Sequence, residues 1–275
     1  MPVSDSVDAE STGTGERGDT TEGPDGDGPT LPINELFYSL QGEGTLAGVP
    51  STFVRTSGCN LRCWFCDSYH TSWEPTHARM TLEEIVAEIE ARDADHVVLT
   101  GGEPLLHGES VALLERLDDR GYHTTVETNG TIHRDAPIDL VSISPKLESS
   151  TPTPERDPRD EIPNESQDEG EWEKRHEDAR IDLESLSALV EAYPFQLKFV
   201  VTDDDDMPEI LELLEDLRGV ADVPVRDEDV LLMPEGATRE RLAETRNRTA
   251  ELAMEYGFRY TPRLHVDLWN DAPET

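Results

Sequence analysis

The sequence has few cysteines, few basic residues and no long apolar segment. Only three cysteines occur among 275 residues, and an odd number close together in one loop cannot form a disulfide framework, which indicates a reducing compartment. No apolar run approaches the roughly 20 residues that span a bilayer, and the N-terminus lacks a basic segment followed by an apolar one. We therefore expect a cytoplasmic protein that neither enters a membrane nor is exported.

Basic residues are also few. The chain carries 23 Lys and Arg against 61 Asp and Glu, a formal charge of -38. Affinity for nucleic acid rests on Lys and Arg that displace counterions, so we expect no direct nucleic-acid binding. Such a carboxylate excess is typical either of a disordered chain or of a folded domain that stays hydrated in concentrated salt. Intact apolar segments such as 195–201 favour the folded, salt-adapted alternative.

Two acidic segments contain almost no large apolar side chains. Residues 1–30 are rich in Gly, Thr, Asp and Glu, which predicts a disordered tail before a single domain at 31–275. Residues 148–178 contain twelve acidic residues, with only Ile162 and Trp172 as large apolar groups. This composition predicts a disordered insertion, whose deletion is expected to leave the fold and activity largely intact.

Elsewhere, short apolar segments alternate with amphipathic ones. Strands are predicted at 33–38, 51–55, 96–100, 122–127, 138–143, 195–201, 229–233 and 258–266. Helices are predicted after the capping-box pattern Thr81-Leu82-Glu83-Glu84 and at 109–120, 182–192, 207–218 and 238–256. This alternation predicts an α/β fold with a parallel sheet of about six strands, either open or curled into an incomplete barrel, with helices outside.

All three cysteines lie in one loop. Cys59, Cys63 and Cys66 have the spacing C-x3-C-x2-C, which lets three thiolates ligate three corners of a cubane iron–sulfur cluster. Ordinary electron-transfer clusters take four cysteines, and this chain has no fourth. The remaining iron is then open to a small chelating ligand. The alternative is a structural zinc site completed by His70 or His77.

Two further segments lie at the ends of predicted strands. Residues 100–104 read Thr-Gly-Gly-Glu-Pro, and paired glycines permit a close approach of the backbone to a ligand. Residues 144–146 read Ser-Pro-Lys and end the strand at 138–143. Ligands of parallel α/β sheets bind at the carboxyl ends of the strands, so both segments are expected beside the cysteine loop.

In this order, the three motifs resemble those of the radical S-adenosylmethionine (SAM) superfamily. In that superfamily the open iron of a [4Fe-4S] cluster is chelated by SAM, and an electron from the cluster cleaves SAM to a 5′-deoxyadenosyl radical. The resemblance implies cluster ligation by Cys59, Cys63 and Cys66. It implies SAM contacts from Phe65, Cys66, Asp67, Gly102, Ser144, Pro145 and Lys146.

Three further segments, 37–45 (FYSLQGEGT), 48–55 (GVPSTFVR) and 66–68 (CDS), closely resemble the 7-carboxy-7-deazaguanine synthase (QueE) family. The resemblance implies a partial TIM-type barrel with a radical SAM core. It also implies a lyase that converts 6-carboxy-5,6,7,8-tetrahydropterin into 7-carboxy-7-deazaguanine and ammonia, toward the archaeosine or queuosine nucleosides of tRNA. Hydrogen abstraction at C6, ring contraction and regeneration of SAM are the implied steps.

The same resemblance implies the substrate contacts. The amino-pyrimidinone edge of a pterin offers N–H donors to Glu43 and to the backbone at 40–42, and its carboxylate calls for a cation such as Arg55. The ordinary alternatives are a solvated turn carboxylate for Glu43, a surface ion pair for Arg55 and a structural role for His265. The complete implied set is Leu40, Gln41, Gly42, Glu43, Arg55, Thr100 and His265.

A magnesium ion, an electron donor and a second subunit complete the implied partners. The family binds Mg2+ two positions after the last cysteine, usually through Thr, and Ser68 keeps the required hydroxyl oxygen. A flavodoxin or ferredoxin type of donor and a homodimer are implied by the resemblance. A glycyl-radical activating enzyme shares the cysteine spacing and the Gly-Gly-Glu-Pro segment, but residues 40–44 and Ser68 favour the pterin enzyme. A non-catalytic zinc-binding module is the third hypothesis.

Overall fold

The computed structural model describes residues 28–156, 170–270 and 272. Most of the predicted N-terminal tail therefore lies outside the described residues. The strands are β1 (Thr30–Leu40), β2 (Pro50–Thr56), β3 (Ala78–Thr81), β4 (His96–Gly101), β5 (His123–Thr128), β6 (Leu140–Ile143), β7 (Phe195–Val201), β8 (Val230–Pro234) and β9 (Arg259–Tyr260). The helices are α1 (Tyr69–Ser72), α2 (Leu82–Glu90), α3 (Glu109–Asp118), α4 (Glu171–Ala179), α5 (Leu183–Ala192), α6 (Asp206–Val220), α7 (Arg239–Tyr256) and α8 (Leu264–Trp269).

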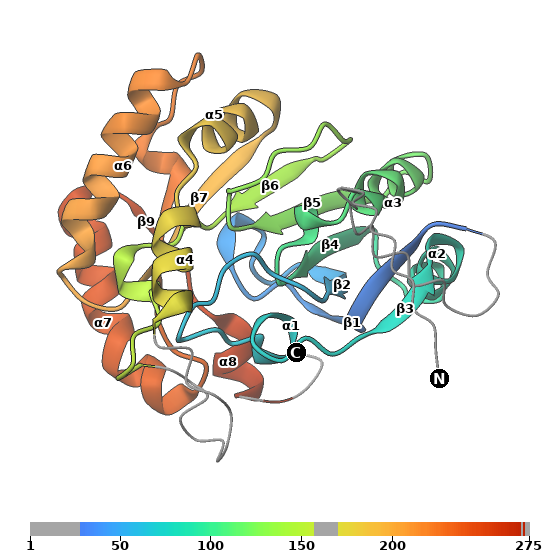
Figure 1. The fold of residues 1–275 in the computed structure, drawn as a ribbon, viewed down its shortest axis with the longest axis horizontal. Helices are drawn as coiled ribbons and strands as arrows, with labels where there is room; N and C mark the ends of the chain where they lie inside the picture. The colour runs from blue at the N-terminus through green and yellow to red at the C-terminus, as the bar shows by residue number, and fades with distance from the viewer. Residues whose placement is uncertain (1–27, 157–169, 271, 273–275) are drawn as a thin grey trace, which may run out of the picture.

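One curved sheet organises the molecule (Figure 1). Its strands follow the order β3-β1-β2-β4-β5-β6-β7-β8-β9. β2 and β4 to β9 run parallel, whereas β1 pairs antiparallel with both β2 and β3. Because the two edges of the sheet are different strands, the barrel is incomplete, and α2, α3, α5, α6 and α7 lie outside it (Figure 1). The predicted α/β class with a mostly parallel sheet is confirmed.

Helix α2 shows how local sequence positions the outer layer. The side chain of Thr81 accepts a hydrogen bond from the Glu84 N–H, and the Glu84 carboxylate accepts one from the Thr81 N–H. This reciprocal capping box satisfies amide groups that a helix start leaves without partners. The helix then buries Leu82, Ile85, Val86 and Ile89 against the sheet. No described helix is long and apolar enough to cross a membrane.

The C-terminal strand prediction is wrong in part. Instead of one strand at 258–266, the chain forms the two-residue strand β9 and then helix α8. Pro262 lies between them, and a proline has no N–H to give to a strand ladder. The turn carries α8 back toward the N-terminal half, where the Leu264 N–H donates to the Gly42 carbonyl at 2.8 Å.

The predicted disordered insertion at 148–178 is also corrected wherever it is described. Residues 148–150 form a 3-10 turn, η3 (Glu148–Ser150), and residues 171–179 form α4. Residues 157–169 lie outside the described residues. Helix α4 is held by a completely buried histidine, His176, and by the ring of Trp172. Polar contacts of this kind are invisible to a prediction based on the number of large apolar residues.

Candidate functional site

A cavity of about 650 Å³ opens at the carboxyl ends of the parallel strands. The cysteine loop, Gly101, Gly102 and the segment at 40–43 all contribute to its lining. Every residue predicted to bind substrate lines it: Leu40, Gln41, Gly42, Glu43, Arg55, Thr100 and His265. Of the predicted SAM contacts, Phe65, Cys66, Asp67, Gly102, Ser144 and Lys146 line it, whereas Pro145 is buried and does not.

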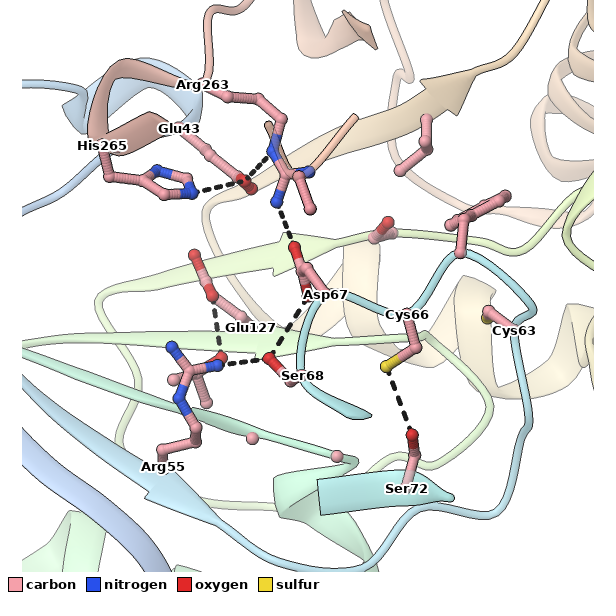
Figure 2. Close-up of a pocket in the computed structure, with 18 of the residues that line it drawn as sticks. Glu43, Arg55, Cys63, Cys66, Asp67, Ser68, Ser72, Glu127, Arg263 and His265 are labelled. Atoms are coloured by element: carbon pink, nitrogen blue, oxygen red, sulfur yellow. Dashed lines mark hydrogen bonds and ion pairs between the residues drawn. The ribbon is translucent and has the colours of Figure 1, made fainter. Parts of the chain in front are cut away.

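The three cysteine thiols face this cavity from a loop without regular structure. Burial raises the pKa of the Cys59 and Cys63 thiols to about 12 and also raises that of Cys66. A metal ion that coordinates such a thiol holds it as the thiolate. Two donors already point at the sulfurs. The Ser72 hydroxyl lies 3.2 Å from Cys66 Sγ (Figure 2), and the Leu61 N–H lies 3.4 Å from Cys59 Sγ.

Three cysteines on one loop are the ligand number that a cubane cluster with one open iron needs. In a cubane each thiolate binds a different iron, so the sulfurs need not converge on one point. Tetrahedral zinc needs its ligands around one centre, and no group of three or more His, Cys, Asp and Glu side chains in the described part of the chain could hold a metal ion. His70 lines the cavity, but His77 is exposed outside it.

The paired glycines bring β4 against the cysteine loop. A Cβ atom at Gly102 would lie 2.2 Å from the Gly58 carbonyl oxygen, and Gly101 has a φ of +137°. Only glycine fits this approach without displacing the loop. The next residue, Glu103, is fully buried and accepts hydrogen bonds from the amides of Leu105 (3.0 Å) and Asn129 (2.7 Å). The glycine pair and Glu103 therefore shape the loops around the cavity.

Glu43 is the centre of a buried charge network at the opposite side of the cavity. Lys198 Nζ donates to Glu43 Oε2 at 2.5 Å, and Arg263 Nε donates to Oε1 at 3.0 Å. His265 Nε2 lies 4.0 Å from the same Oε1 (Figure 2). Burial alone would raise the pKa of Glu43, but Lys198 and Arg263 hold it well below its usual range. Glu43 is therefore an ionised acceptor, which excludes the alternative of a solvated turn carboxylate.

Three charged residues of this network, Glu127, Lys198 and Arg263, were not predicted as site residues. Glu127 accepts from Gln41 Nε2 at 3.2 Å and from the Thr100 hydroxyl at 2.8 Å. Its place near the carboxyl end of β5 is a signal that could have identified it, because ligands of parallel sheets bind at that edge. Lys198 carried a second signal, since it is a lone cation within the apolar strand β7.

Arg55, Ser68 and Asp67 connect this network to the cysteine loop. Arg55 Nη1 donates to Ser68 Oγ at 2.5 Å, and the Ser68 hydroxyl lies 3.2 Å from Asp67 Oδ1. Asp67 is in turn paired with Arg263 (Figure 2). Arg55 Nε also lies 3.0 Å from Glu35 Oε2, but as an ion pair without hydrogen-bond geometry. Arg55 therefore lines the cavity, as predicted for a substrate contact, and also forms the ion pair that was the alternative interpretation.

His265 reaches the cavity from helix α8, not from a strand as the sequence predicted. A Cβ atom at Gly42 would lie 1.9 Å from His265 Nδ1, so the imidazole packs directly on the glycine backbone. The hydrogen bond from Leu264 to Gly42 fixes this packing. Helix α8 thereby forms one wall of the cavity.

Comparisons with known proteins agree with this geometry. A model of the radical SAM superfamily matches residues 53–149. A 7-carboxy-7-deazaguanine synthase from Halobacterium salinarum is 63% identical over 276 residues, covering 100% of both chains. One from Rhodopirellula baltica is 40% identical over 238 residues, covering 86% of each. The crystal structure of QueE from Escherichia coli superposes with a TM-score of 0.59 at 26% identity, covering 86% of this chain and 95% of that one.

These similarities favour neither the zinc-binding module nor the glycyl-radical activating enzyme. The superfamily match begins on β2 and includes the cysteine loop, the glycine pair and residues 144–146. The identity to the Halobacterium salinarum protein extends over the whole chain, including the segments that supply Glu43 and His265. The chain belongs to the 7-carboxy-7-deazaguanine synthase family of radical SAM enzymes.

Proposed function

We propose that this enzyme converts 6-carboxy-5,6,7,8-tetrahydropterin into 7-carboxy-7-deazaguanine with release of ammonia, as a step toward 7-deazapurine nucleosides of tRNA. The observation that carries the proposal is one cavity lined both by the three cysteines and by the Glu43 and Arg55 side chains. The pyrimidinone edge of a carboxypterin needs an acceptor for its N–H groups, and its carboxylate needs a cation; Glu43 and Arg55 would supply these on the cavity that the three cysteines also line. Two relatives that match 86% or more of the chain bear the name 7-carboxy-7-deazaguanine synthase.

The enzyme uses a [4Fe-4S] cluster and SAM, which together supply the hydrogen-abstracting radical when bound. Cys59, Cys63 and Cys66 would hold the cluster. The SAM contacts would come from Phe65, Asp67, Gly102, Ser144 and Lys146, all of which line the cavity. Lys146 Nζ already donates to Ser144 Oγ at 2.7 Å, so this pair presents an oriented hydroxyl and an ammonium group at the end of β6.

The chain's own residues would bind and orient the pterin. Glu43 keeps unused lone pairs after pairing with Lys198 and Arg263, because a carboxylate has about four acceptor sites. It can therefore accept N–H groups of the pyrimidinone edge. The Thr100 hydroxyl gives its proton to Glu127 and so presents an oxygen acceptor to the cavity. Helix α8, with His265 packed on Gly42, would exclude water from this side.

Magnesium binding at Ser68 would bring a second cation to an oxygen that Arg55 already contacts. Ser68 Oγ accepts a hydrogen bond from Arg55 at 2.5 Å, and although the hydroxyl oxygen has a second lone pair, a guanidinium and Mg2+ on the same oxygen would repel each other. We infer that Arg55 turns to the substrate carboxylate when substrate enters, and that this movement frees Ser68 for the metal ion. Substrate and Mg2+ would then bind cooperatively.

Replacing Ser68 tests the magnesium assignment. Ser68→Ala is expected to leave cluster content and SAM binding intact, but to weaken the response of turnover to Mg2+ on the order of tenfold or more, the scale seen when even an outer-sphere metal contact is lost. Ser68→Thr should be tolerated because it keeps the hydroxyl. Turnover is measured against Mg2+ concentration for the wild type and both variants. An unchanged Mg2+ response in Ser68→Ala would remove Ser68 from the metal site.

The partners beyond the small-molecule substrate are also proposals. The resemblance to the family supports a homodimer and a flavodoxin or ferredoxin type of electron donor, and light scattering would establish the oligomeric state. The charge of -38 supports a cytoplasm of high salt content as the working environment. The identity to a protein from Halobacterium salinarum supports the same environment.

Anaerobic turnover tests the proposed function directly. Cluster-loaded protein is incubated at high salt with SAM, Mg2+, a reductant and the carboxy-tetrahydropterin. We expect a product with the mass of 7-carboxy-7-deazaguanine, one ammonia per product, and many products per SAM. If cluster-loaded, SAM-binding protein left the pterin unchanged, the proposed substrate would be wrong.

A further inference from the structure

Helix α4, in the segment predicted to be disordered, contacts the cysteine loop through His176. The imidazole is completely buried. The Arg62 N–H donates to its Nδ1 at 3.1 Å, and its Nε2 lies 2.9 Å from Ser150 Oγ. Arg62 directly precedes Cys63 in the sequence. The histidine therefore connects the backbone beside a cluster ligand to the turn η3 at the other end of the insertion.

The direction of each hydrogen bond follows from this geometry. Because His176 Nδ1 accepts from a backbone N–H, the proton of the neutral ring is on Nε2 and is donated to Ser150 Oγ. The Ser150 hydroxyl in turn lies 2.6 Å from the Leu147 carbonyl oxygen, to which it donates. Each group in this chain has a partner, as buried polar groups require.

A second pair of contacts holds the other side of Cys63. The Trp64 N–H donates to the Ser150 carbonyl at 3.1 Å, and the indole Nε1–H donates to the Ser149 carbonyl at 2.7 Å. The Arg62 guanidinium also lies over the ring of Trp172 on α4, 4.1 Å from its centroid. Both sequence neighbours of Cys63, Arg62 and Trp64, are thus held by residues of the segment 148–178.

We propose that Ser149, Ser150 and His176 form a brace that holds the cysteine loop in the conformation that binds the cluster. The proposal rests on the proposed function, because it takes the three cysteines to be the cluster ligands. His176 contacts Arg62 rather than a cysteine, so it is a positioning residue. Residues 57–68 form no helix or strand, and a loop ordered in advance loses less conformational entropy when it binds its ligand.

The test uses cluster retention, a readout that does not depend on turnover. His176→Leu keeps the bulk of the side chain but leaves the Arg62 N–H buried without an acceptor, a loss worth roughly tenfold or more in an equilibrium. After anaerobic reconstitution, we expect an iron chelator to remove the cluster from His176→Leu on the order of tenfold faster than from the wild type. His176→Asn should restore retention, since Asn Oδ1 can take the place of Nδ1.

His96→Leu is the matched control. His96 is a buried histidine at the start of β4, with hydrogen bonds to Ser51 (2.7 Å) and Thr125 (2.8 Å), and it does not contact the cysteine loop. Both Leu variants lose two buried hydrogen bonds, so both should unfold at lower temperature, but only His176→Leu should lose its cluster faster. Equal cluster loss in the two, or no rescue by Asn, would overturn the proposal.

A milder variant keeps the test decisive if His176→Leu does not fold. Trp64→Phe removes the indole donor to Ser149 while keeping an aromatic ring beside Arg156 and Phe65. It is expected to speed cluster loss severalfold and to alter the electron paramagnetic resonance spectrum of the reduced cluster. A spectrum and a loss rate identical to those of the wild type would contradict the brace. If the wild-type protein itself assembled no cluster, the proposed function would fail instead, and the two failures remain distinguishable.

Discussion

Replacement of any one of Cys59, Cys63 and Cys66 by Ala is expected to abolish cluster assembly and turnover together. The chain has no other cysteine to substitute, so two irons of the cube would lack a protein ligand after a single replacement. Cys63 is the most stringent case, because it is the most buried of the three and lies between the two brace contacts. Iron and acid-labile sulfide per chain are measured after anaerobic reconstitution, with turnover measured on the same samples.

Ser72→Ala provides the control for this experiment. It removes the hydroxyl 3.2 Å from Cys66 Sγ but no ligand. It should therefore keep iron and sulfide at the wild-type level and shift only the reduction potential, which depends on hydrogen bonds to the sulfurs. A cysteine variant that retained full iron, sulfide and turnover would show that the ligand assignment is wrong. A wild-type protein that was colourless and contained zinc would instead support the zinc-binding module.

Local signals predicted much of the fold. β7 has the predicted bounds, Phe195–Val201, because aromatic and aliphatic residues occupy five of its seven positions and alternate with Gln196 and Lys198 at its start, which is typical of a strand. The capping box at Thr81 and Glu84 fixed the start of α2 equally well. The predicted substrate residues all line one cavity for a related reason, since the carboxyl ends of parallel strands meet at one edge of the sheet.

The parts that were missed depend on contacts between distant segments. Glu43 is paired with Lys198 and Arg263, which are 155 and 220 positions away in the sequence. No local pattern indicates such pairing. Helix α4 was missed for the same reason, because His176 is stabilised by the backbone of Arg62 and the hydroxyl of Ser150 rather than by an apolar face. That deletion of 148–178 is harmless stays a prediction, but the proposed brace leads to the opposite expectation: the deletion should speed loss of the cluster.

Lys198→Met is expected to lower the free energy of unfolding by about 3–5 kcal/mol, the usual cost of removing one partner from a buried ion pair. Lys198 and Glu43 are both nearly inaccessible to solvent, and Nζ lies 2.5 Å from Oε2. Met keeps the length of the side chain, so the lost charge dominates the effect. Arg248→Met is the matched control: its ion pair with Asp204 also measures 2.5 Å but is exposed, so stability should barely change.

The pH dependence of the free energy of unfolding distinguishes loss of this ion pair from loss of side-chain packing at Lys198. In the wild type Lys198 and Arg263 hold the pKa of Glu43 below its unfolded value, so its contribution to stability is present above the unfolded pKa of about 4.3 and is lost as the pH falls through the folded pKa. In Lys198→Met the pKa of Glu43 rises, because burial remains and one cation is gone. The stability deficit of the variant should therefore be largest at neutral pH and narrow in acid.

Adding Glu43→Gln to Lys198→Met removes the carboxylate that lost its lysine partner. In Lys198→Met the buried Glu43 carboxylate keeps only Arg263 as a hydrogen-bond partner, whereas the double variant buries no carboxylate at this position. The double variant should therefore recover much of the lost stability and lose the extra pH dependence. If Glu43 is the pterin's acceptor, as proposed above, the double variant should not recover turnover. Urea unfolding of the wild type, both single variants and the double variant at neutral and acid pH gives the coupling energy. Strictly additive effects at both pH values would mean that Lys198 and Glu43 stabilise the protein independently, and the charge network would then not be the unit that holds Glu43 in the cavity.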